Sequence, residues 1–236
     1  MGQKSRLKKL RRTQVQQSKP LHSGPEALRE FGFEITLEPL RNEDIPPEIR
    51  DEKPSLFQQC QVDPAGMIPR LEKLVDQYPG TASLKNWLSV AYSRVGRFED
   101  SQVMIARAFR ENPDYLFAKL GYAEICLGSN RVHEIPVIFG GKTELHELFP
   151  GRTCFHISEF TGFYFVMCRY AIATGDLPSA RRYFRKLYRG APDSRPVGLL
   201  ARQIGTALLA TIDNHPAATP HALRQELRRT IQPGTA

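Results

Sequence analysis

The sequence of 236 residues lacks any long hydrophobic run, because no eighteen consecutive apolar residues occur, and it therefore predicts no transmembrane helix. It also lacks an apolar segment near the N-terminus, so we expect no secretory signal peptide. Cysteine is scarce, and no CxxC pair occurs. This spacing favours reduced thiols in a cytoplasmic protein over a disulfide framework or a paired-cysteine zinc site. The four cysteines are Cys60, Cys126, Cys154 and Cys168, of which Cys126 and Cys168 lie in apolar helical patterns and are predicted core residues.

The motifs of common catalytic sites are missing as well. The sequence contains no GxSxG, HExxH, P-loop or dinucleotide-binding fingerprint. Gly140-Gly141-Lys142 looks like the end of a phosphate-binding loop, but Pro136 stands where the first glycine of that loop is required. We therefore predict a protein that is not an enzyme and needs no cofactor.

Five residues of types that bind zinc occur within a short stretch of the chain. Two of them are separated by one residue, and the spacing of the others is loose, so we interpret the set as polar residues of a loop and of a helix start. A metal-dependent enzyme built on residues 144–159 remains the weakest alternative. The five are His146, Glu147, Cys154, His156 and Glu159.

Positive charge is distributed unevenly along the chain. The formal net charge is +8, and residues 1–19 contain seven basic and no acidic residues, so the remaining 217 residues are close to neutral. A block of like charge without an apolar repeat predicts a disordered tail, and no basic folded surface is expected. This tail is either solvated or in contact with RNA or a ribosome through phosphate groups, while membrane contact is less favoured. Its basic residues are Lys4, Arg6, Lys8, Lys9, Arg11, Arg12 and Lys19.

Two segments share a pattern in which amphipathic helices flank a glycine and end at a proline. Gly96 lies 17 residues before Pro113, and Gly175 lies 17 residues before Pro192. On both sides of each glycine, apolar residues recur at the spacing of one helix face. The glycine can adopt the left-handed conformation that ends a helix, and the proline cannot continue the second helix. Residues 82–113 and 161–192 are therefore predicted helical hairpins.

These two hairpins resemble the tetratricopeptide repeat family. The resemblance implies an all-α fold, a short and irregular solenoid of helical hairpins, with large residues between the helices and small residues where they approach closely. It rests on Trp87, Leu88, Tyr92, Gly96, Phe98, Ser101, Ile105, Ala108 and Pro113 in the first hairpin, and on Tyr164, Met167, Cys168, Gly175, Leu177, Ala180, Phe184 and Pro192 in the second.

Helical periodicity continues around the hairpins, which places the predicted helical domain at residues 66–213. Residues 66–80 indicate a lone second helix, and residues 116–128 a further first helix. An insertion is expected near 134–158, because Pro136, Gly140 and Gly141 break helices, and a short helix is expected to begin within it near Thr143. Residues 195–213 suit a capping helix. Residues 214–236 predict a short final helix and a tail.

The segment 20–65 is predicted to be an extended, proline-rich arm. Phe31, Phe33, Ile35 and Leu37 alternate with smaller or polar residues, which is the period of a β-strand. Prolines follow at intervals through residues 39–54 and stiffen the chain. A single strand leaves backbone groups unpaired, so this strand either packs across the solenoid, pairs with a second copy or folds on a partner.

In the architecture that the resemblance implies, the first helix of each hairpin lines the concave surface. We therefore predict an adaptor that binds another protein there, as a peptide or a helix. One subtype of the family clamps a C-terminal carboxylate with Lys, Asn and Arg, and only Asn86 and Arg169 match it here, which favours an apolar helix or an extended peptide. The candidate groove residues are Asn86, Val90 and Arg94, then Phe117, Leu120 and Glu124, then Phe165, Arg169 and Ile172, of which Phe117, Leu120 and Phe165 fit the core equally well.

Overall fold

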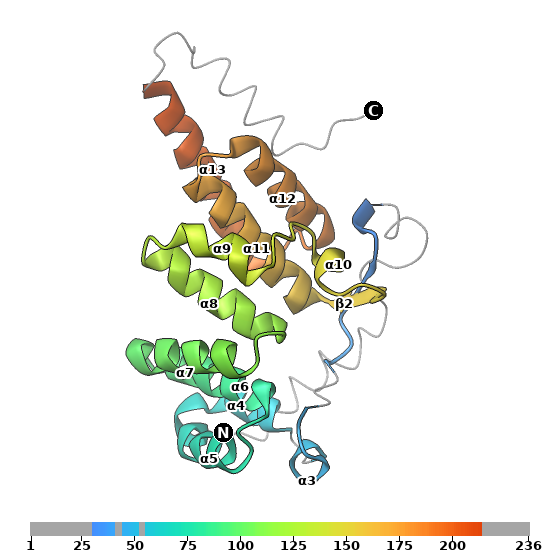
Figure 1. The fold of residues 1–236 in the computed structure, drawn as a ribbon, viewed down its shortest axis with the longest axis vertical. Coiled ribbons are helices and arrows are strands. Elements are labelled where there is room, and N and C mark those ends of the chain that lie inside the picture. Colours follow the sequence, from blue (N-terminus) through green and yellow to red (C-terminus); the bar gives the residue numbers. More distant parts are fainter. Residues whose placement is uncertain (1–29, 41–43, 52–54, 214–236) are drawn as a thin grey trace, which may run out of the picture. The chain divides into compact units, whose positions relative to one another are not determined.

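The computed structural model describes residues 30–40, 44–51 and 55–213, the last six by their backbone alone. The described chain is mostly helical, which confirms the all-α class (Figure 1). It forms two compact units: a central unit within residues 41–141, and a discontinuous unit whose described residues are 30–40 and 142–213. None of the described helices has the length and apolar character of a membrane span. The predicted tails at 1–19 and 214–236 lie outside the described residues.

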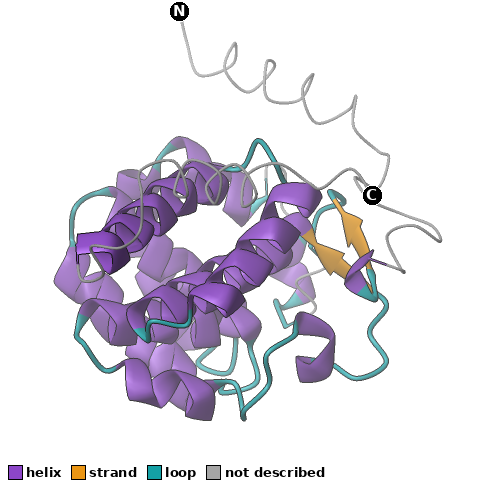
Figure 2. Cartoon of the chain, turned by 90° about the horizontal axis from the view of Figure 1, so that it is seen from above, coloured by secondary structure: helices purple, strands orange, loops and turns teal. Residues whose placement is uncertain are grey.

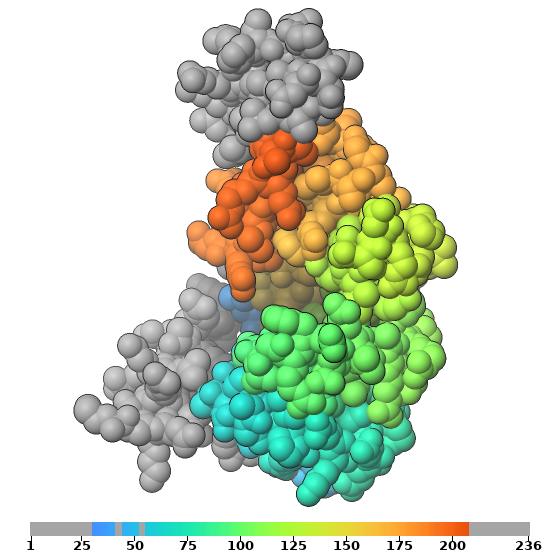
Figure 3. Space-filling model, turned by 90° about the vertical axis from the view of Figure 1, so that its left-hand side faces the viewer, coloured from blue at the N-terminus to red at the C-terminus, as the bar shows by residue number. Residues whose placement is uncertain are grey.

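The central unit is a series of helices in which each packs on the next. After the short α3 (Pro47–Arg50) come α4 (Leu56–Val62), α5 (Pro64–Gln77), α6 (Ala82–Arg94), α7 (Phe98–Glu111) and α8 (Leu116–Gly128). Helix α6 packs along both α5 and α7 and also contacts α4 and α8. In space-filling view these helices follow one another from cyan to green (Figure 3). The unit ends with the 3-10 turn Val132–Glu134 and α9 (Ile135–Ile138).

The turns and buried residues of the two predicted hairpins agree with the sequence pattern. Gly96 and Gly175 have φ angles of +82° and +75°, the left-handed conformation that a side chain would strain. Trp87 and Phe184 point into the core of their respective units. Cys168 is fully buried, as is Cys126, so the prediction that both are core residues is confirmed.

The prediction of an extended arm over residues 20–65 is wrong for its later part, which contains α3 and α4. Helix α4 begins at a capping box, in which Ser55 Oγ accepts from the Gln58 backbone N–H and the Gln58 side chain accepts from the Ser55 N–H. Pro47 and Pro64 each occupy the first position of a helix, where a missing N–H costs nothing. The helix predicted over 66–80 is therefore not alone, because α4 packs against α5.

In the discontinuous unit, a helical hairpin carries a further helix and a small sheet. Helices α11 (Ile157–Ala173) and α12 (Leu177–Gly190) form the hairpin, and α13 (Arg195–Asp213) contacts both. The predicted insertion supplies α10 (Leu145–Leu148) and strand β2 (Cys154–His156), which leads directly into α11. A short helix near Thr143 is thus confirmed as α10.

The strand predicted from residues 31–37 has a partner within the same chain. Strand β1 (Glu34–Thr36) pairs with β2 in parallel, with Ile35 opposite Phe155 (Figure 2). Phe33 packs edge-on against Phe155, with ring centroids 4.8 Å apart, and both rings are fully buried. The strand therefore needs neither a second copy nor a partner, which corrects the prediction. Burial of the Phe33 and Phe155 rings stabilises a pairing between strands that are about 120 residues apart in the sequence.

Candidate interaction face

The outer side of α6 carries the first three predicted groove residues, and α4 lies beside it. Val90 is 40 % exposed, one turn after the buried Trp87. The ring of Phe57 on α4 lies 5.9 Å from the ring of Trp87 and is 47 % exposed. Two apolar side chains on neighbouring helices thus remain in contact with solvent. The buried Trp87, which is the single tryptophan of the sequence, lies next to them.

A cation lies on the same helix as Val90. Arg94 is exposed, and its guanidinium donates to the side-chain oxygen of Gln61 on α4 over 2.5 Å. Gln61 is neutral, so this bond fixes the direction of Arg94 without neutralising its charge. Asn86, one turn before Val90, is half-buried. We call the set Phe57, Gln61, Asn86, Val90 and Arg94 the α4–α6 face.

The predicted groove residues of α8 are less accessible than those of α6. Leu120 is only 6 % exposed and belongs to the core of the central unit, so it presents no surface to a partner. Phe117 is half-buried, with its ring 5.7 Å from that of Tyr115, and Glu124 is half-buried too. Of the two alternatives left open for Leu120, the structure supports core packing.

The three predicted residues of α11 lie in the discontinuous unit. Phe165, Arg169 and Ile172 are each half-buried on this helix. The guanidinium carbon of Arg169 lies 5.5 Å from the centre of the Phe165 ring, a cation–π contact within one turn. These residues form a local group of their own, whereas Asn86, Val90 and Arg94 lie in the central unit.

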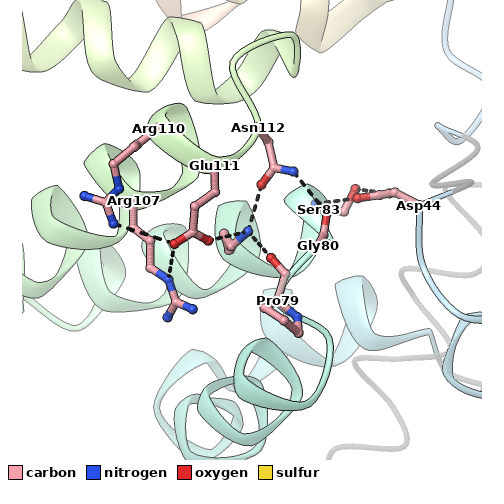
Figure 4. Close-up of polar contacts among 9 residues, drawn as sticks. Asp44, Pro79, Gly80, Ser83, Arg107, Arg110, Glu111 and Asn112 are labelled. Atoms are coloured by element: carbon pink, nitrogen blue, oxygen red, sulfur yellow. Dashed lines mark hydrogen bonds and ion pairs between the residues drawn. The ribbon is translucent and has the colours of Figure 1, made fainter.

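The start of α6 is held by a lysine that has no exposed surface. Lys85 Nζ donates to Asn112 Oδ1 at 2.8 Å and to the carbonyl of Pro79, and it forms a 2.9 Å ion pair with Glu111 (Figure 4). The hydrogen bond from Lys85 is the largest cause that lowers the pKa of Glu111. Since these partners come from the α5–α6 turn and the end of α7, the lysine joins three successive helices.

A second polar anchor binds the segment before α3 to the start of α6. The Asp44 carboxylate accepts from the backbone N–H of Ser83 at 2.8 Å and from its hydroxyl at 2.7 Å (Figure 4). Carboxylates are favourable at this position, because the first turn of a helix has free N–H groups and a positive dipole end. Thr81 Oγ1 also donates to the Asp44 carbonyl at 3.2 Å. These hydrogen bonds fix the position of the start of α6.

Three of the five potential zinc ligands are engaged in structural contacts. Glu159 accepts a two-fold ion pair from Arg152, at 3.0 and 2.6 Å, and also the backbone N–H of His156. Glu147 accepts the N–H groups that precede α10, which lowers its pKa. His156 caps α11, and its burial lowers the pKa of the ring. Within the described residues no three such side chains converge on a point.

Charge on the described surface also differs from expectation. The sequence predicts no basic folded surface, yet residues 177–213 contain seven basic residues and two acidic ones. Helix α12 buries its apolar side, including Phe184 and Leu187, and turns charged residues outward. The net charge summed over residues 20–236 is close to neutral, so it does not reveal this local excess of positive charge.

Sequence reasoning missed the contribution of α4 to the α4–α6 face. Phe57 and Gln61 fell in the segment predicted as extended, so neither was a candidate. The Ser55-x-x-Gln58 capping box is a local signal that would have found this helix. The basic residues at 1–19, proposed for RNA contact, lie outside the described residues.

Comparison with known proteins does not identify a family for this chain. Neither a scan against models of protein families nor a search of curated proteins finds a match for this chain. The resemblance to tetratricopeptide repeats therefore rests on the pattern of residues given above.

Proposed function

We propose that this protein is a non-catalytic adaptor that binds another protein through the α4–α6 face. The observation that carries the proposal is the exposure of Phe57 and Val90 beside the guanidinium of Arg94, which forms no ion pair with a described carboxylate. Apolar side chains grouped on an otherwise ordinary surface are typical of binding sites. Helices stacked in hairpins, like those of a tetratricopeptide-like solenoid, present such faces rigidly.

The chemistry of the face defines the partner. An apolar side chain seated between Phe57 and Val90 leaves water, which is worth about 1.5–3 kcal/mol for a fully buried residue. A carboxylate one turn away on the partner pairs with Arg94, which is already held by Gln61 and loses little side-chain freedom on binding. The occupant is therefore a peptide or helix of another protein with an apolar residue close to an acidic one.

Two matched valines provide the test of this proposal. Val90 on α6 and Val103 on α7 are both exposed, at 40 % and 69 %, but Val103 lies outside the α4–α6 face. We expect Val90→Glu to remove specific partners from affinity capture analysed by mass spectrometry. The new carboxylate would replace an apolar contact, pair with Arg94 four residues later and repel an acidic partner.

The variant Val103→Glu adds the same charge and should leave the set of partners unchanged. Circular dichroism checks that both variants fold. If Val90→Glu and Val103→Glu capture the same partners as the wild type, the α4–α6 face is not the binding site.

The distribution of charge favours a second candidate function, an RNA- or ribosome-associated factor. Seven of the eight net positive charges fall within residues 1–19, where they could neutralise phosphates without folding. This role is compatible with an adaptor, because one segment holds the RNA and the folded part holds the protein partner.

A further inference from the structure

Helices α12 and α13 carry a local excess of basic over acidic residues. Residues 177–213 contain seven basic residues, of which six are arginines, and two acids, Asp193 and Asp213. Salt-bridging surfaces normally mix both signs, so this excess is a local feature rather than the average of the chain. The basic residues are Arg181, Arg182, Arg185, Lys186, Arg189, Arg195 and Arg202.

Carboxylates from other elements neutralise only part of this charge. Lys186 pairs with Glu144 at 2.6 Å, and Arg189 pairs with Glu30 at 2.8 Å. Arg185 is exposed and forms no ion pair with a described carboxylate. Arg182 is exposed as well, and its partner is the hydroxyl of Tyr183 at 3.2 Å, whose ring also lies beneath the guanidinium at 4.9 Å.

The basic residues are arranged in a row along one helix. The exposed residues Arg182, Arg185 and Arg189 follow one another at intervals of three and four residues, which corresponds to steps of roughly 4.5–6 Å along the axis. Like charges at this spacing destabilise an isolated helix, since they repel one another. Burial of Phe184 and Leu187 on the opposite side keeps the helix folded and the row directed outward.

The kind of cation and the lack of exposed apolar groups indicate what the row binds. Arginine presents a planar fork of donors that matches phosphate oxygens, which lysine does not. An anionic membrane surface would favour apolar side chains beside the charges, but no large apolar side chain described on these two helices is exposed. Tyr188 precedes Arg189 in the chain and is half-buried, with its ring 6.2 Å from that of Phe184, and its accessible part can support a base.

We propose that the exposed row of α12, formed by Arg182, Arg185 and Arg189, binds the phosphate backbone of a single strand of nucleic acid. None of these residues belongs to the α4–α6 face or to residues 1–19. RNA and DNA strands share the backbone chemistry, so two probes of the same sequence are needed to tell them apart.

The test measures binding of fluorescent oligouridine RNA, and of the matching DNA, to the full chain by anisotropy, at salt concentrations between about 50 and 200 mM. The double variant Arg182→Gln/Arg185→Gln should reduce the slope of log K against log salt by about 1.4, since each phosphate contact to a single strand contributes about 0.7. Arg185→Gln alone should reduce it by about 0.7. An RNA strand that binds more tightly than DNA identifies the natural ligand as RNA.

The control removes two arginines from another helix. Arg107→Gln/Arg110→Gln changes the net charge equally, on α7, and should leave the slope unchanged. An identical slope for wild type and both double variants would overturn the proposal. A second control tests competitors of the bound probe at equal negative charge. If polyglutamate displaces the probe as effectively as unlabelled RNA does, the proposal is overturned, because the row would then bind an acidic protein equally well.

Discussion

At the scale of single residues, Lys85 is the most unusual side chain of the central unit. A charged group without exposed surface is stable only when hydrogen bonds replace the water it has lost. Here Pro79, Glu111 and Asn112 supply them, and Asn112 in turn donates to the Gly80 carbonyl at 3.0 Å. The residue therefore fixes the relative position of α5, α6 and α7, on which the α4–α6 face depends.

Replacing this lysine should weaken the fold of the central unit. Lys85→Met keeps the length of the side chain but leaves the Pro79 carbonyl and Asn112 oxygen without a donor, at a cost of about 1–3 kcal/mol in the free energy of unfolding. Urea unfolding followed by fluorescence reports on this unit, because Trp87 is the single tryptophan. Lys73→Met, which changes an exposed lysine of α5, should have no measurable effect.

The same variant should change how stability depends on pH. The pKa of Glu111 is lowered from its ordinary 4.5, chiefly by the hydrogen bond from Lys85. A lowered pKa in the folded state gives stability that is present above about pH 4.5 and is lost as the pH falls through the folded value. In Lys85→Met this loss should be smaller, and an equally steep loss would show that Glu111 is not coupled to the lysine.

At the scale of secondary-structure elements, the end of α12 shows how closely elements of the discontinuous unit pack. A Cβ atom on Gly190 would lie 2.4 Å from Cζ of Phe160 and 3.1 Å from Cδ1 of Ile35. Both neighbours are fully buried, so neither can move aside cheaply. The glycine therefore allows α12 to approach both α11 and β1.

Replacing two glycines in neighbouring helices by alanine should change the free energy of unfolding in opposite directions. Gly190→Ala should lower the free energy of unfolding by about 1–3 kcal/mol through overpacking. Gly198 on α13 has open space where the Cβ would lie, so Gly198→Ala should raise stability by about 0.5–1 kcal/mol through better helix propensity. Thermal unfolding by circular dichroism compares the two, and a stabilised Gly190→Ala would contradict the close approach.

At the scale of the whole molecule, positive charge is concentrated in two places: residues 1–19 and the region of α12 and α13. Each contributes separately to binding of a polyanion, because every neutralised phosphate releases its counterions independently. The adaptor proposal involves neither region.

Deleting residues 1–19 tests the RNA role of the first charged region. If its seven basic residues neutralise phosphates of single-stranded RNA, the deletion should reduce the salt slope by about 5. The contribution of α12 should then remain and still respond to Arg182→Gln/Arg185→Gln. An unchanged slope after the deletion would mean that the tail is only solvated.

The sequence by itself determined the helices of the two hairpins and the turns between them. Their signals are local: an apolar period of one helix face, Gly96 and Gly175 in the left-handed conformation, and a proline at the end. Only the tertiary structure decided the pairing of β1 with β2, the burial of Lys85 and Leu120, and the place of Phe57 beside Trp87. Those features depend on residues far apart in the chain, whose contacts become favourable only when the intervening helices have packed.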